Sequence, residues 1–209
     1  MRALIFDFDG TIANTLPIVL SQTARISQKY KLNKEAQEIL KLASQLPLWQ
    51  LLRELNISWI KKFFILWDVK QAQEQLSTEI EYIEPFHGMK EVLTELANRR
   101  IKLYIYSSNI QKIVVKFLEK EKIINLFEKI YTGGSLFGKA KGLTKILKKE
   151  NLTNTEVLYV ADEIRDLIAC RKANIKMIGV AWGLAGEETL VQAHTDFIVR
   201  NPIEILEII

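Results

Sequence analysis

Two short acidic segments, each directly after a short apolar run, constrain the fold of this 209-residue chain most. Residues 3–6 lead into Asp7 and Asp9, and residues 157–161 lead into Asp162. Both runs are apolar without alternation, which is typical of parallel strands buried on both faces. Ligands bind at the carboxyl edge of open α/β sheets, so carboxylates that follow two such strands can converge. Converging carboxylates repel one another unless a cation lies among them, and oxygen ligands suit a hard ion such as Mg²⁺.

The rest of the chain beyond residue 83 alternates between helical and strand patterns. We expect helices at 88–99, 110–120, 140–149, 164–172 and 187–192, strands at 101–106, 129–131, 156–161, 176–181 and 196–199, and a last helix after Pro202. Alternation of this kind favours a doubly wound parallel sheet with right-handed crossovers. The predicted fold class is therefore α/β.

Residues 15–82 interrupt this alternation. They contain no convincing strand pattern, and their apolar residues recur at helical spacing. Pro85 and Gly88 then break the helical pattern and mark a return hinge. We predict a module of several short helices at 15–82, inserted into an α/β core domain formed by 1–14 and 83–209.

Composition narrows the function classes. The formal charge is +4, but the lysines are scattered and form no basic block, which argues against nucleic-acid binding and mildly favours an anionic substrate. Cys170 is the only cysteine, so no intramolecular disulfide can form, and we interpret it as a core residue. The N-terminal apolar run is too short for a signal peptide, and no stretch is long enough for a membrane helix. We expect a cytoplasmic protein without a membrane partner.

Asp7 and Asp9 stand two residues apart, and Gly10 lets the chain turn sharply after them. A carboxylate at a strand end beside Mg²⁺ can attack phosphorus, while a second carboxylate carries the proton of the leaving group. The competing interpretation is an ordinary turn with a helix cap at Asp9 and Thr11. For the pair alone, both interpretations remain open.

The other candidate residues also follow predicted strands. Ser107, with Ser108 and Asn109, precedes a helix and can bind phosphate, although a simple helix cap needs no ligand. Lys139 or Lys141 can neutralise a phosphoryl oxygen, but most lysines are only solvated.

Acidic residues follow the strand predicted at 156–161. Asp162 can bind a metal with Glu163 or Asp166 in support, or this can be an acidic first turn that favours the helix dipole. The order of acid pair, hydroxyl, lysine and acid, each after an apolar strand, favours the functional interpretation.

These motifs resemble those of the haloacid dehalogenase-like hydrolase superfamily over nearly the whole chain. The match consists of the segment DFDGT at 7–11, then Ser107, Lys139 and the acidic segment 162–166. The helical insertion looks like the cap of the subgroup that contains phosphoglycolate phosphatase and β-phosphoglucomutase. The third motif lacks the usual Lys-Pro pair, so the choice of Lys139 over Lys141 stays open.

The resemblance implies a phosphatase that acts on a small phosphorylated metabolite through an aspartyl phosphate. Asp7 would be the nucleophile, and Asp9 would protonate the leaving group and then activate water. The resemblance places Mg²⁺ on the side chains of Asp7 and Asp162 and the backbone carbonyl of Asp9. It assigns the phosphoryl oxygens to Ser107 and Lys139, with Ser108 and Asn109 beside them, and supporting roles to Thr11, Glu163 and Asp166.

Three alternatives remain. A phosphomutase of the β-phosphoglucomutase type shares this machinery and cap. A phospho-receiver module also combines acids, a hydroxyl and a lysine at strand ends, although it needs no lid. A binding protein without turnover is the third. We expect a monomer or a homodimer, and we interpret the tryptophans of the helical module as cap core or as a dimer surface rather than a stacking site.

Overall fold

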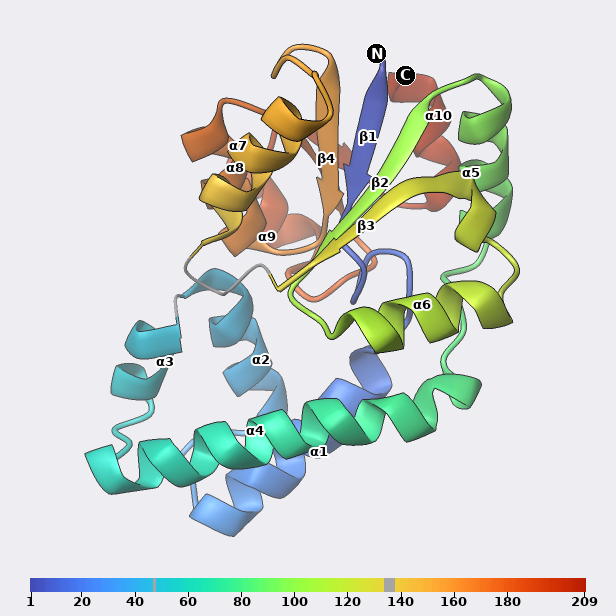
Figure 1. The fold of residues 1–209 in the computed structure, drawn as a ribbon. Helices are drawn as coiled ribbons and strands as arrows, with labels where there is room; N and C mark the ends of the chain where they lie inside the picture. Colours follow the sequence, from blue (N-terminus) through green and yellow to red (C-terminus); the bar gives the residue numbers. More distant parts are fainter. Residues whose placement is uncertain (47, 134–137) are drawn as a thin grey trace.

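The computed structural model describes residues 1–46, 48–133 and 138–209 (Figure 1). Six parallel strands form one sheet in the order β3-β2-β1-β4-β5-β6. The strands are β1 (Ala3–Phe6), β2 (Lys102–Ser107), β3 (Phe127–Thr132), β4 (Val157–Ala161), β5 (Lys176–Val180) and β6 (Phe197–Val199). The prediction of a doubly wound α/β fold is confirmed.

Helices cover both faces of this sheet (Figure 1). They are α5 (Met89–Asn98), α6 (Gln111–Lys120), α7 (Lys139–Lys149), α8 (Ile164–Ala173), α9 (Gly186–Gln192) and α10 (Ile205–Ile208), with short 3₁₀ turns at Ile124–Leu126 and Pro202–Glu204. Leu4 and Phe6 of β1 pack in a cluster with α5, α6 and α10, whereas Ala3 and Ile5 pack with α7 and α8. The strand period of two thus sends alternate side chains to two cores, which explains why β1 is apolar throughout.

Four helices lie beyond the carboxyl ends of the strands and form the helical module (Figure 1). They are α1 (Leu16–Tyr30), α2 (Ala36–Gln45), α3 (Leu48–Glu54) and α4 (Trp59–Glu79), followed by a 3₁₀ turn at Ile80–Tyr82. Their own core contains buried Ile39, Leu52 and Ile65. The expectation that all these helices are short is wrong for α4, which has 21 residues. Apolar residues on nearly every side of this helix hide the one-sided pattern that normally reveals a long helix.

The two chain segments that join the module to the sheet are hydrogen bonded to each other. The backbone N–H of Asn14 donates to the carbonyl of Glu84 at 2.9 Å, and the N–H of Phe86 donates to the carbonyl of Ile12 at 3.0 Å. Ala13 and Pro85 form an antiparallel bridge between them. The module is thus attached through one paired, two-stranded connection directly beside the first acidic motif.

Candidate active site

The strand register brings the two acidic motifs together. β1 pairs with β4 so that Phe6 faces Val160, and the N–H of Asp7 donates to the carbonyl of Val160 at 2.8 Å. Asp7 and Asp162 therefore leave neighbouring strands at the same edge of the sheet. β2 lies on the other side of β1 and brings Ser107 to this edge. This is the convergence that the sequence predicts.

Lys139, the first residue of α7, connects Asp7 to Asp166. Its Nζ lies 2.9 Å from Oδ2 of Asp7 and 2.6 Å from Oδ1 of Asp166, and 5.3 Å from the centre of the Tyr159 ring. Lys141, two residues further along the same helix, is exposed. Of the two lysines left open by the sequence, Lys139 is the one that contacts Asp7.

Asp162 is buried against the first motif and the segment after β5. Its Oδ1 accepts a hydrogen bond from the Thr11 hydroxyl at 3.2 Å, and its Oδ2 accepts one from the N–H of Leu184 at 2.8 Å. A Cβ on Gly10 would lie 2.3 Å from Asp162 Oδ2, and a Cβ on Gly183 would lie 2.1 Å from Asp162 Cβ. Both distances are far below van der Waals contact, so the carboxylate occupies space that only glycine leaves.

Asn109 holds the carboxylate of Asp9. Its Nδ2 donates to Oδ2 at 2.9 Å and to Oδ1 at 3.2 Å, while its own Oδ1 accepts the N–H of Ile110 at 2.7 Å. The hydroxyl oxygen of buried Ser107 accepts the N–H of Asn109 at 3.0 Å. Ser108 is exposed beside them. Residues 107–109 therefore orient the carboxylate of Asp9. The sequence did not reveal this contact.

The remaining acids of the site are Glu163 and Asp166. Glu163 accepts hydrogen bonds from the guanidinium of Arg165, with Nε at 2.7 Å from Oε2. Asp166 is buried, and its Oδ2 has no hydrogen-bond partner among residues 1–46, 48–133 and 138–209. A solvated acid at a helix N-terminus would be exposed, so the interpretation of Asp166 as a simple helix-dipole residue does not describe its surroundings.

Burial and mutual repulsion raise the pKa of several of these carboxyl groups above its ordinary value. Burial, then the charge of Asp7, raises the pKa of Asp9 to about 7, against the hydrogen bond from Asn109. Burial, then Glu163 and Asp7, raises the pKa of Asp162 well above its usual range. Burial tends to lower the pKa of Lys139, but the charges of Asp166 and Asp7 outweigh this effect and raise it. The site thus contains more buried negative charge than Lys139 and Arg165 balance.

These features fit a divalent cation. Raised carboxyl pKa values and the unpartnered Asp166 oxygen are what a cluster short of positive charge displays. Among residues 1–46, 48–133 and 138–209, no three histidine, cysteine or acidic side chains converge as a metal site of their own. The expected ligand set needs only Asp7, Asp162 and the carbonyl of Asp9, because Mg²⁺ commonly binds one or two carboxylates and keeps several waters.

Two positioning features escaped the sequence-based prediction. The segment after β5 supplies the Leu184 N–H to Asp162, and the Nε1 of Trp182 donates to the carbonyl of Thr11 at 3.2 Å. Tyr159 supports Lys139 from β4, and its hydroxyl donates to the carbonyl of Tyr106 at 3.0 Å. The signal for the first feature was present, because the apolar run at 177–180 also ends at this edge of the sheet.

Comparison with known proteins agrees with this geometry. The model of the haloacid dehalogenase-like hydrolase family matches residues 4–180. The chain belongs to this family. A phosphoglycolate phosphatase from Synechococcus elongatus is 27% identical over 207 residues, which cover 99% of this chain and 96% of that protein.

Further known proteins resemble the chain over its whole length. A pyrophosphatase, PpaX, from Oceanobacillus iheyensis is 24% identical and covers 100% of this chain, with 97% of its own length matched. The solved structure of a haloacid dehalogenase-like family hydrolase from Streptococcus pneumoniae superposes with a TM-score of 0.83 at 17% identity, covering 100% of this chain and 98% of that one. At such an identity the superposition shows the fold alone.

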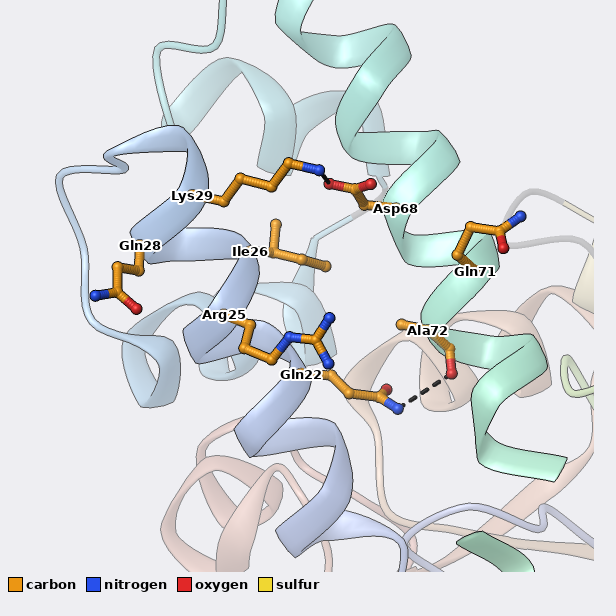
Figure 2. A pocket seen from close by; sticks show the side chains of 8 residues that line it. All are labelled: Gln22, Arg25, Ile26, Gln28, Lys29, Asp68, Gln71 and Ala72. Atoms are coloured by element: carbon orange, nitrogen blue, oxygen red, sulfur yellow. Dashed lines mark hydrogen bonds and ion pairs between the residues drawn. The ribbon is translucent and has the colours of Figure 1, made fainter. Parts of the chain in front are cut away.

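A cavity of about 430 Å³ lies between α1 and α4 of the helical module (Figure 2). Lys29 closes one end by pairing with Asp68, with 2.6 Å between Nζ and Oδ2, and Tyr30 donates to the same oxygen at 2.8 Å. At the other end, Gln22 donates to the carbonyl of Ala72 at 3.1 Å. The charge of Lys29 is thus directed to a neighbouring helix.

None of the helices in the described part of the chain is both long and apolar enough to cross a membrane.

Proposed function

We propose that this member of the family is a Mg²⁺-dependent phosphatase that hydrolyses a small phosphorylated metabolite. The observation that carries the proposal is the position of the Asp7 carboxylate, 2.9 Å from Lys139 and beside Asp9, at the point where three parallel strands end. Phosphoryl transfer demands positioning and charge neutralisation, and this edge provides both.

Asp7 is the proposed nucleophile. Its Oδ1 accepts the N–H of Phe8 at 2.8 Å and its Oδ2 contacts Lys139, so the carboxylate is held in one orientation for attack on phosphorus. Attack forms an Asp7–phosphorus bond and breaks the bond from phosphorus to the leaving oxygen. Lys139 and Ser107 bind the phosphoryl oxygens in this proposal, and Ser108 lies beside them.

Asp9 carries the proton in both steps. In the metal-free site, burial and the charge of Asp7 raise the pKa of Asp9 to about 7, which favours the protonated form that donates to the leaving alkoxide. The carboxylate formed can then accept a proton from the water that hydrolyses the phosphoaspartate. Asn109 keeps this carboxyl in place for both transfers.

Mg²⁺, bound by the side chains of Asp7 and Asp162 and the carbonyl of Asp9, would screen the repulsion between the nucleophile and the anionic substrate. Thr11 orients Asp162 through its hydrogen bond, and Asp166 orients Lys139. Glu163 is held by Arg165 beside them.

The helical module, residues 15–82, is the proposed cap that covers the site and selects the substrate. A largely apolar cavity of about 660 Å³ separates α1 and α2 from residues 183–189 of the core, so the two parts are not packed tightly together there. The paired connection at Ala13 and Pro85 is the proposed hinge, because both chain segments that join the module to the core pass through it.

Release of phosphate from a generic aryl phosphate, with and without Mg²⁺, tests the proposal. We expect activity that chelation abolishes and that Asp7→Asn removes, while Lys141→Gln, an exposed neighbour of Lys139, remains active. A panel of phosphorylated sugars, phosphorylated hydroxy acids and inorganic diphosphate then identifies the substrate class. The relative named PpaX is a pyrophosphatase, so diphosphate belongs in that panel. Isomerised sugar phosphate without phosphate release would instead identify a mutase, and binding without turnover would identify a receiver or binding protein.

A further inference from the structure

The outer face of α4 exposes an unusual number of large apolar side chains. Half of those exposed in the described part of the chain lie between Trp59 and Val69. Trp59 is 81% exposed, Phe63 70% and Trp67 56%, and Phe64, Leu66 and Val69 of the same segment are exposed as well. Because Ile65 and Leu76 already bury the opposite side of the helix, this face has no role in the core of the module.

The exposed apolar area of this helix lies at the upper end of what a monomer presents. Full burial of an aromatic side chain removes about 150–250 Å², so the four exposed aromatics present about 400–650 Å² before Leu66 and Val69 are added. The largest apolar patch of a typical monomer is about 300–600 Å². Each partner of a stable interface buries about 800 Å², and this face supplies most of that area.

The order of the aromatic residues is symmetric along the helix. Trp59, Phe63 and Trp67 are four residues apart and form one ridge on the helix surface. The order Trp, Phe, Trp is the same from either end of the ridge. A two-fold axis through Phe63 would therefore place Trp59 of one copy opposite Trp67 of the other and Phe63 opposite its own copy. A two-fold interface requires such a self-complementary surface.

From the area and the symmetric ridge, we propose that the chain forms a homodimer in which α4 packs antiparallel against α4 of a second copy. Helical spacing places Lys62 and Lys70 next to the ridge, where they would remain at the rim in solvent. An anionic membrane surface also suits aromatic residues with neighbouring lysines, but a bilayer does not require the palindromic order. This inference is independent of the phosphatase proposal.

Light scattering and sedimentation of the full chain, from about 1 μM upward, test the dimer. We expect twice the 24.2 kDa of one chain. Phe63→Glu should give monomers, because two charges would face each other at the axis. Tyr82→Glu is the matched control, since Tyr82 is 85% exposed but lies outside the ridge, and this variant should remain a dimer. Circular dichroism should show that both variants fold.

A mixture of two variants tests the symmetry itself. Phe63→Glu and Phe63→Lys should each be monomeric alone but form a mixed dimer together, because opposite charges then meet at the axis. Failure of the mixture to associate would overturn the two-fold through Phe63. A monomeric wild-type chain, or a Phe63→Glu chain that still dimerises, would overturn the proposal. So would a wild-type monomer that binds vesicles of phosphatidylcholine and phosphatidylserine through Phe63.

Discussion

Lys139 Nζ lies 2.9 Å from Asp7 Oδ2, although the two residues are 132 positions apart in the chain. The same ammonium group contacts Asp166 at 2.6 Å, so one cation holds two buried carboxylates, one directly after β1 and the other in α8. Attraction to both acids raises the pKa of Lys139 despite its burial, which keeps the side chain charged at any pH at which the enzyme would work.

Lys139→Met should reduce phosphatase activity by about 10²–10³-fold, because one charged contact to the phosphoryl oxygens is lost. Steady-state rates of phosphate release measure this effect. Lys141→Met is the control, since Lys141 is exposed on the same helix, and it should remain within about twofold of the wild type. Equal losses in the two variants would contradict the assignment of Lys139.

Asp9→Asn should stabilise the metal-free protein at alkaline pH while removing activity. In the folded chain the pKa of Asp9 is about 7 instead of 3.8, so the fold favours the neutral carboxyl. Stability is therefore lost as pH rises from about 4 to 7, and the whole cost is present above pH 7. Asn stays neutral, and we expect a gain of about 2 kcal/mol at pH 8, less than the full shift gives because solvent reaches part of the carboxyl.

Thermal unfolding in chelator at pH 4 and pH 8 checks the prediction for Asp9. The two proteins should have similar stability at pH 4, where both side chains are neutral, and should differ at pH 8. A wild-type chain that is as stable as the variant at pH 8 would show that the Asp9 carboxyl is not held in its neutral form.

Gly183→Ala should impair the site without changing any catalytic group. The added Cβ would lie 2.1 Å from Cβ of Asp162, so the segment or the carboxylate must move. We expect a weaker response to Mg²⁺ and a loss of activity of about tenfold or more. Leu184→Ala keeps the N–H that binds Asp162 and serves as the control. A fully active Gly183→Ala protein would contradict the tight packing around Asp162.

Mg²⁺ should raise the unfolding temperature of the wild-type protein. A ligand that binds only the folded state stabilises it by about 2.7 kcal/mol at a concentration of one hundred times its Kd. Asp162→Asn should remove most of this response, whereas Glu128→Gln, on exposed β3 surface, should retain it. The shift in unfolding temperature does not depend on turnover, so it tests the cation site even if the proposed substrate class is wrong.

The sequence predicts the sheet well because its signals are local. Apolar runs such as Ala3–Phe6 are buried on both faces, and the acids that follow them must then emerge at one edge. Most predicted elements lie within a few residues of the observed ones. The partners of individual side chains depend on long-range packing, and for that reason the sequence did not reveal that Asn109 binds Asp9 or that Leu184 binds Asp162.

The helical module was less predictable for a related reason. In α4 one face packs in the module core and the other exposes Trp59, Phe63 and Trp67, so hydrophobicity alone does not distinguish inside from outside. The choice between Lys139 and Lys141 was open because both precede the same helix pattern. Only the start of α7 at Lys139, directly opposite Asp7, separates them.

Detection of a phosphoryl group on Asp7 tests the central claim most directly. The wild type and the Asp9→Asn variant are mixed with substrate, quenched in acid within one turnover and digested for mass spectrometry. We predict a phosphorylated peptide that contains Asp7, more abundant in Asp9→Asn because water is no longer activated, and absent in Asp7→Asn. Phosphate release by the Asp7→Asn protein, or turnover by the wild type with the label on another residue, would contradict the account.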